Sequence, residues 1–425
     1  MYRNSESPRT LSALFLLAAL WGCAATGTTT DGAGVAVGAG GAPGATAGTG
    51  GTGGASTAIV NDIDLRPIEF EMSSGGGQTC FPSLNDPASP TPNYDQFSPI
   101  VGKHCLGTNH QAIQGVQRVA FLGDSVTVGT PNLQHLLSID NGHFWRNKLA
   151  DWLIGKFGVN KGNDLDYGLW RTYDYFSGKG GKVKSGALWN CSKWGGRTDD
   201  LLEGGKQLAE CFPSYPAKGA DEVTLVVFTL GGNDISAMTK KGVDAPADEV
   251  NAGYPAAWQI AKDTIFHLEN GLKWLKDPAM FPNGVYVVFA NPFEFTDGTG
   301  KTDACVPQSV LDVPGIGKFD LSKLNVNMAE LAGFKPWAKP EIQAKIVLWM
   351  LEEYMRLAVK YQVDLVWMLE NFCGHGYVAT GPNADPKAVC YLGPDAELWF
   401  DDTCTHPNDA GHGAIFNMFR AVIEE

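Results

Sequence analysis

Ser125 stands where a buried strand is expected to end, and this position makes it the first residue to consider for chemistry. The apolar run over 118–122 is typical of a strand, and Gly123 and Asp124 interrupt it directly before the serine. In an open α/β sheet, ligands bind beyond the carboxyl ends of the strands. A nucleophilic serine would be well placed there, although the same residues also fit an ordinary turn with a helix cap. We interpret Asp124 as a structural residue of that turn.

Three further polar segments follow, over 195–198, 231–234 and 401–408. Nucleophilic catalysis by serine needs a histidine to take the hydroxyl proton, a group that orients the imidazole, and donors aimed at the oxyanion. His406 can supply the first function, and the side-chain amide of Asn233 can donate to an oxyanion. The sequence therefore contains the parts of a serine hydrolase.

These segments, in this order, resemble the SGNH hydrolases, the GDSL-type lipases and esterases. The resemblance covers 116–425 and depends on Gly-Asp-Ser-Val at 123–126, Gly-Gly-Asn-Asp at 231–234 and His-Pro-Asn at 406–408. It implies a three-layer, flavodoxin-like α/β/α fold with a central parallel sheet, and an ester hydrolase without a metal or an organic cofactor. The roles that it implies are Ser125 as nucleophile and oxyanion donor, Gly196 and Asn233 as further donors, and His406 as general base.

The orienting acid departs from the family pattern. The family places an aspartate three residues before the histidine, and here that position is Thr403. We expect Asp402 to orient His406, with Asp401 as the second choice and a backbone carbonyl as the third. Valine at 126, where the family has leucine, is a conservative change. The Gly-x-Ser-x-Gly elbow of ordinary α/β-hydrolases is excluded, because Thr127 occupies its second glycine position.

Alternating strand and helix patterns from residue 116 onward predict the sheet that would position these groups. The expected strands are 118–122, 224–230, 285–290 and 363–368, with a weaker one at 187–191. Two helices are expected from apolar stripes, one formed by Trp145, Leu149, Trp152 and Leu153 and the other by Val347, Leu351, Tyr354 and Met355. Further helices are expected over 251–277 and 409–423. The segments 159–186 and 292–338 look like insertions over the edge of the sheet.

The first 56 residues indicate an export signal and a linker rather than part of a folded domain. Arg3 and Arg9 precede an apolar run that is too short to span a bilayer, which is typical of a signal peptide over 1–22. Leu-Trp-Gly-Cys at 20–23 resembles a bacterial lipobox and implies lipidation of Cys23. The Gly-, Ala- and Thr-rich segment 23–56 would be a flexible tether. We expect an outer-membrane or cell-surface lipoprotein, with a soluble periplasmic or secreted protein as the alternative.

Cysteine usage and charge agree with that location. Of the nine cysteines, eight remain for disulfides if Cys23 carries lipid. We expect a lead-in segment held by disulfides over 57–115, followed by a catalytic domain over 116–425. Pairing neighbours would join Cys80 with Cys105, Cys191 with Cys211, Cys305 with Cys373, and Cys390 with Cys404. The formal charge of -14 argues against a nucleic-acid partner, so membrane attachment would come from the lipid alone.

Two other functions remain open at this stage. A surface binding protein could keep the scaffold without the chemistry, and an acyltransferase would share the acyl-serine intermediate. The sequence does not choose among short acyl esters, acyl lipids and acetylated glycans as substrates. We expect a monomer.

Overall fold

The computed structural model describes residues 80–81, 91–129, 141–174, 177–202, 206–305, 310–313, 317–320, 328–331, 333–381 and 384–425. The predicted signal peptide, Cys23, the tether and much of the lead-in lie outside these residues.

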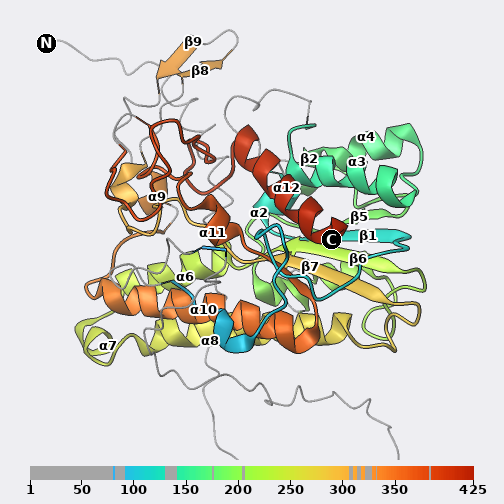
Figure 1. Cartoon of the computed structure of the whole chain (residues 1–425), viewed down its shortest axis with the longest axis horizontal. Helices are drawn as coiled ribbons and strands as arrows, with labels where there is room; N and C mark the ends of the chain where they lie inside the picture. Colours follow the sequence, from blue (N-terminus) through green and yellow to red (C-terminus); the bar gives the residue numbers. More distant parts are fainter. Residues whose placement is uncertain are drawn as a thin grey trace, which may run out of the picture.

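A six-stranded sheet forms the centre of the described part of the chain (Figure 1). The order is β10-β7-β6-β1-β5-β4, with parallel pairing throughout except that β4 runs antiparallel to β5. The strands are β1 (Arg118–Gly123), β4 (Lys184–Ser185), β5 (Leu188–Asn190), β6 (Thr224–Thr229), β7 (Val285–Ala290) and β10 (Asp364–Val366). Each predicted strand is confirmed, with small shifts at the ends, and the short edge strand β4 was not predicted.

Helices cover both faces of the sheet, which makes a three-layer α/β/α sandwich. Successive strand side chains point to opposite faces, so Ala120 and Leu122 of β1 join one core while Val119 and Phe121 join the other. The first core packs against α5 (Gln207–Cys211), α6 (Gly232–Val243), α8 (Pro255–Leu275) and α10 (Pro340–Tyr361). The second packs against α2 (Ser125–Val128), α3 (Trp145–Phe157), α4 (Asp164–Arg171) and α12 (Asp409–Glu424). In Figure 1, α8 and α10 lie below the sheet and α3 and α12 above it.

Shorter elements occupy the predicted insertions and the connections. They are α7 (Ala247–Asn251), α9 (Met328–Leu331), α11 (Met368–Phe372), the hairpins β2 (Tyr173–Asp174) with β3 (Lys179–Gly180) and β8 (Val310–Val313) with β9 (Gly317–Asp320), and the 3-10 turns Asp95–Phe97, Thr198–Leu201 and Thr302–Ala304. Among the helices that the structure describes, none has the length and apolar character needed to cross a bilayer.

The end of the lead-in, over 91–115, packs onto the edge strand β10. The Asp364 carboxylate accepts hydrogen bonds from Thr108 Oγ1 at 3.0 Å, from the His110 N–H at 2.6 Å and from Gln111 Nε2 at 2.9 Å. The Thr108 N–H donates to the Leu365 carbonyl at 3.0 Å, and the Leu365 N–H donates to Thr108 Oγ1 at 2.9 Å, so this segment also pairs backbone groups that the strand edge would otherwise expose.

Candidate active site

Ser125 is the first residue of α2 and lies directly beyond the carboxyl end of β1. Gly123 makes this turn with φ of 126°, and a Cβ at that position would lie 2.4 Å from the Thr229 carbonyl oxygen. Asp124 caps α2 by accepting the Val126 N–H at 3.0 Å, and it also accepts the Thr229 hydroxyl at 2.9 Å. Burial raises the pKa of Asp124 to about 7. The interpretation of Asp124 as a structural turn residue is confirmed.

The structure brings Ser125 and His406 into contact, although 281 positions separate them in the sequence. Ser125 Oγ lies 2.9 Å from His406 Nε2. The serine comes from the end of β1, and the histidine from the loop that precedes α12. A hydroxyl at this distance from a ring nitrogen can transfer its proton directly to the ring, which is the geometry that a general base requires.

The other ring nitrogen of His406 contacts a hydroxyl rather than a carboxylate. His406 Nδ1 lies 2.9 Å from Thr403 Oγ1, and Thr403 Oγ1 lies 2.5 Å from Asp401 Oδ1. The direct partner of His406 Nδ1 in the structure is therefore Thr403, and not Asp402 as predicted. Asp401, the second choice, reaches the ring only through Thr403.

The loop itself explains why Asp401 does not touch the ring. The Asp401 N–H donates to the His406 carbonyl at 2.9 Å, so the loop closes on itself and turns the Asp401 side chain inward. The Thr403 N–H also donates to Asp401 Oδ1 at 2.9 Å. Asp401 is 6% exposed, and its burial raises its pKa to about 7. Sequence reasoning noticed Thr403 as a departure but did not foresee it as a partner of the histidine.

The environment of His406 favours the neutral imidazole. Loss of water around the ring lowers the pKa of His406 to about 4. At neutral pH the ring is therefore uncharged, and Nε2 can accept the proton of Ser125 when Nδ1 carries the ring hydrogen.

Gly196 and Asn233 lie together beside the nucleophile turn. Asn233 Nδ2 donates to the Gly196 carbonyl at 3.0 Å, and a Cβ on Gly196 would lie 2.8 Å from the Gly123 carbonyl oxygen. The Gly196 N–H donates to the Lys193 carbonyl at 3.0 Å in this structure. The Asn233 amide keeps a second hydrogen that this bond does not use.

Two buried side chains hold these loops against the sheet. Gln207 accepts the Gly123 N–H at 2.7 Å and donates to the Gly123 carbonyl at 2.9 Å. Asp234 accepts the Thr198 N–H at 3.2 Å and the Thr198 hydroxyl at 3.0 Å, and burial raises its pKa to about 6. Asp234 therefore ties the Asn233 loop to the 195–198 segment.

Arg146 supports α2 from below and was not predicted. Its side chain is 0% exposed and donates to the carbonyls of Thr127 at 3.0 Å, Val128 at 3.2 Å and Trp170 at 3.1 Å. Burial lowers the pKa of Arg146 to about 9. A cation at the C-terminus of a helix interacts favourably with its carbonyl groups, so Arg146 fixes the helix that begins with Ser125.

Two of the four predicted disulfides are found, and the other two are paired differently. Cys80–Cys105 and Cys191–Cys211 are as predicted, whereas Cys305 bonds to Cys404 and Cys373 to Cys390. Pairing by the shortest loop failed because the fold, rather than chain proximity, brings the 292–305 segment to the histidine loop. Cys404 lies two residues before His406, so this bridge anchors the loop that carries the imidazole.

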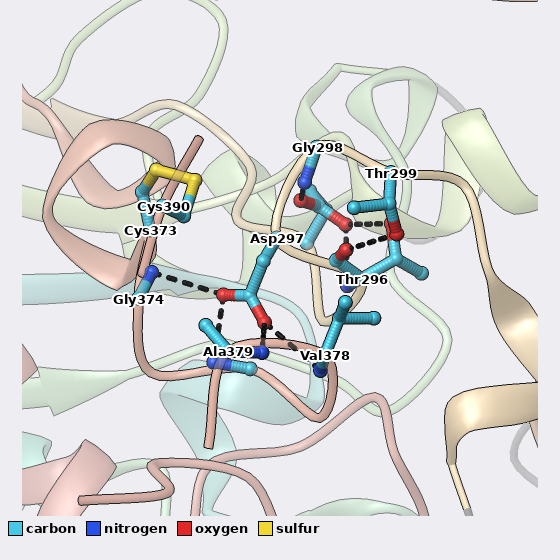
Figure 2. The surroundings of a disulfide bond; sticks show 11 residues. Thr296, Asp297, Gly298, Thr299, Cys373, Gly374, Val378, Ala379 and Cys390 are labelled. Atoms are coloured by element: carbon cyan, nitrogen blue, oxygen red, sulfur yellow. Dashed lines mark hydrogen bonds between the residues drawn. A yellow bond between two sulfur atoms is a disulfide. The ribbon is translucent and has the colours of Figure 1, made fainter. Parts of the chain in front are cut away.

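The 292–305 segment is also fixed to the loop that follows α11. Figure 2 shows the Asp297 carboxylate beside the Cys373–Cys390 disulfide, accepting backbone N–H groups from that loop. The donors are Gly374 at 2.9 Å, Gly376 at 2.9 Å, Val378 at 3.1 Å and Ala379 at 2.8 Å. Asp297 therefore fixes the segment that carries Cys305, whose bridge to Cys404 holds the histidine loop.

Within the described residues, no group of three His, Cys, Asp or Glu side chains has the arrangement of a metal site. Arg197, next to Gly196, donates its backbone N–H to Asp200 at 2.9 Å at the start of a 3-10 turn.

Comparison with solved structures finds proteins with a similar layout. An extracellular lipase from Streptomyces rimosus is 14% identical, with a TM-score of 0.35, over 72% of this chain and 100% of that one. A phospholipase A1 from Streptomyces albidoflavus is 13% identical, with a TM-score of 0.37, over 72% of this chain and 99% of that one. A GDSL-like lipase from Parabacteroides merdae is 13% identical, with a TM-score of 0.38, over 74% of this chain and 98% of that one.

No family model matches the sequence, and no curated protein does.

Proposed function

We propose that this protein is an exported serine esterase or lipase that cleaves carboxylic esters through an acyl-serine intermediate. The observation that carries the proposal is the 2.9 Å contact between Ser125 Oγ and His406 Nε2 at the carboxyl edge of the sheet. A serine hydroxyl beside a neutral imidazole is the pair that nucleophilic ester cleavage requires.

In the proposed mechanism, His406 takes the proton of Ser125 while the serine oxygen attacks the ester carbonyl. The resulting imidazolium then protonates the departing alcohol. Water attacks the acyl-serine in the second half of the reaction, with His406 again acting as base, and the free acid leaves.

The oxyanion would be held by the Ser125 N–H and by the Asn233 amide hydrogen that does not bond Gly196. Gly196 joins them as the third donor once its N–H turns away from the Lys193 carbonyl, to which it donates at 3.0 Å. Ser125 and Asn233 lie in the first turns of α2 and α6, and Gly196 lies in the loop between these two helices in the sequence.

The four disulfides are typical of a protein that leaves the cytoplasm. We further propose that lipidated Cys23 attaches the protein to a membrane and that 23–56 tethers the catalytic domain, without nucleic acid as a partner and with a monomeric enzyme. The Cys23→Ala variant should then leave the membrane fraction, and retention there would contradict the anchor.

The activity test uses the full chain against p-nitrophenyl esters of increasing acyl length, together with a fluorophosphonate probe. Wild type should hydrolyse at least one ester and be labelled, while Ser125→Ala should do neither and keep its circular dichroism spectrum. A folded wild-type protein that neither labels nor hydrolyses would identify a binding protein on the same scaffold. Adding a competing alcohol separates the two acyl-enzyme chemistries, because an acyltransferase would yield the new ester in place of the free acid.

A further inference from the structure

The histidine loop places a threonine hydroxyl between the imidazole and the buried acid. Thr403 Oγ1 lies 2.9 Å from His406 Nδ1 and 2.5 Å from Asp401 Oδ1. A hydroxyl has one hydrogen to donate and two lone pairs to accept with. Asp401 Oδ1 also accepts the Thr403 N–H at 2.9 Å, which makes Oδ1 an acceptor oxygen, so the hydrogen of the Thr403 hydroxyl points to Asp401 and a lone pair faces the ring.

We propose that Thr403 is the positioning residue of the base, accepting the Nδ1–H of His406 while it donates to Asp401. This inference depends on the proposed esterase function and names the group that replaces the orienting carboxylate. The hydrogen bond fixes the tautomer in which Nε2 is unprotonated and faces Ser125. Asp401 acts one step further back, because its carboxylate determines which way the Thr403 hydroxyl points.

The competing partners in the loop are less well placed. Thr405 Oγ1 lies 3.4 Å from His406 Nδ1, which is long for a hydrogen bond between a hydroxyl and a ring nitrogen. The side chain of Asp402 is half-exposed, whereas Asp401 is 6% exposed. Asp401 Oδ2 has no hydrogen-bond partner among the described residues, so the Thr403 side chain and N–H satisfy this carboxylate through Oδ1 alone.

The proposed reaction needs no proton transfer through Thr403. The Ser125 proton moves to His406 Nε2 as the serine oxygen bonds to the carbonyl carbon, and it leaves with the alcohol. Thr403 keeps its hydrogen throughout, and its lone pair stabilises the imidazolium through the Nδ1–H. A neutral acceptor stabilises that cation less than an adjacent carboxylate would, which agrees with the low pKa of His406.

The test compares Thr403→Val, which removes the hydroxyl at almost constant volume, with Thr403→Ser, which keeps it. Thr403→Val should lower kcat by about 10- to 100-fold with little change in KM, because it removes one hydrogen bond to an ionising ring. Thr403→Ser should recover most of that loss. Thr405→Val makes the same chemical change next to the same ring nitrogen and should lower kcat by less than about threefold.

The pH profile and the ring tautomer separate positioning from mere folding. Thr403→Val should move the acid limb of kcat/KM to lower pH, because the imidazolium loses its acceptor, and Thr403→Asp should move it to higher pH. Asp401→Asn should lower kcat more than Asp402→Asn does. Asp401 and His412 of α12 also lie close to His406. Burial raises the pKa of Asp401 to about 7, so the profile of Asp401→Asn shows which part of the pH dependence belongs to that carboxyl. Burial holds the pKa of His412 well below the ordinary value, so it stays neutral through this range.

Nitrogen-15 NMR of the histidine rings, assigned with His406→Gln, reads the tautomer without any substrate. The proposal expects hydrogen on Nδ1 of His406 in wild type and in Thr403→Ser, and a mixed or inverted tautomer in Thr403→Val. Wild-type rates and pH profile in a folded Thr403→Val, or hydrogen on Nε2 in wild type, would overturn it. If wild type hydrolyses no ester and takes no fluorophosphonate, the esterase function fails, and the NMR result still decides the hydrogen-bond relay.

Discussion

Removing the Cys305–Cys404 disulfide should lower both the stability and the activity of the protein. This bridge joins residues 99 positions apart, whereas Cys373–Cys390 joins residues 17 apart. In the chain-entropy account of cross-links, closing the longer loop stabilises the fold by about 4.7 kcal/mol, and closing the shorter one by about 3 kcal/mol. The double variant Cys305→Ala/Cys404→Ala should therefore lose several kcal/mol of its free energy of unfolding.

The effect on catalysis follows from the position of the bridge. Cys404 is 0% exposed and adopts φ of 67°, a left-handed conformation that a non-glycine residue keeps only where its surroundings hold it. His406 follows two residues later. A displacement of about 1 Å in a reacting group can cost on the order of 10²-fold in rate, so we expect a loss of about that size in kcat.

The assay measures urea unfolding by circular dichroism and kcat on the best p-nitrophenyl ester, and the matched control is Cys80→Ala/Cys105→Ala. The control bridge spans 25 positions, for which the same account gives about 3.5 kcal/mol. Its loss should lower stability but leave kcat of the folded enzyme near the wild-type value. Unchanged kcat and stability in the Cys305→Ala/Cys404→Ala variant would refute the reasoning. Peptide mapping that finds Cys305 joined to Cys373 would refute the pairing itself.

Three further predictions concern the base, the oxyanion donors and the support of α2. Because burial lowers the pKa of His406 to about 4, and the base must be neutral to act, kcat/KM should persist as the pH falls below 6.5 and decline only near 4. An acid limb at about 6.5 would contradict this. Asn233→Asp keeps the side-chain shape but removes the donors, so kcat should fall by about 10²- to 10³-fold, and loss of the bond to the Gly196 carbonyl should lower the melting temperature as well. Arg146→Met leaves several buried carbonyls without a donor and should cost about 3 kcal/mol or more in urea unfolding. A loss below about 1 kcal/mol would show that water or other donors replace the guanidinium.

The sheet could be predicted from the sequence because its strands are continuous apolar runs that end in glycine or polar residues. Residues 224–229 form β6 with every side chain buried, which is the pattern that a strand covered on both faces requires. The two-residue strand β4 could not be predicted, since Lys184 and Ser185 carry no strand pattern and pair only because β5 lies beside them.

Site residues could be predicted where a sequence motif identifies a single residue. They could not be predicted where several adjacent residues could serve and only the conformation of the loop determines which one makes the contact. Ser125 and His406 were found because each stands at a strand end or before a helix in a recognisable order. The sequence predicted a carboxylate rather than Thr403 as the partner of His406, because the sequence does not show that the loop turns the Asp401 side chain inward. The exchange of disulfide partners has the same origin, since loop length is readable in a sequence and spatial proximity is not.

The 281 positions between Ser125 and His406 also bear on when the protein can become active. Synthesis delivers Ser125 281 residues before His406, and the bridge that holds the histidine loop forms only under oxidising conditions. A chain that is still being synthesised therefore carries Ser125 without the base that we propose for it. The proposed chemistry would begin only after α12 and the loop before it have packed against the sheet.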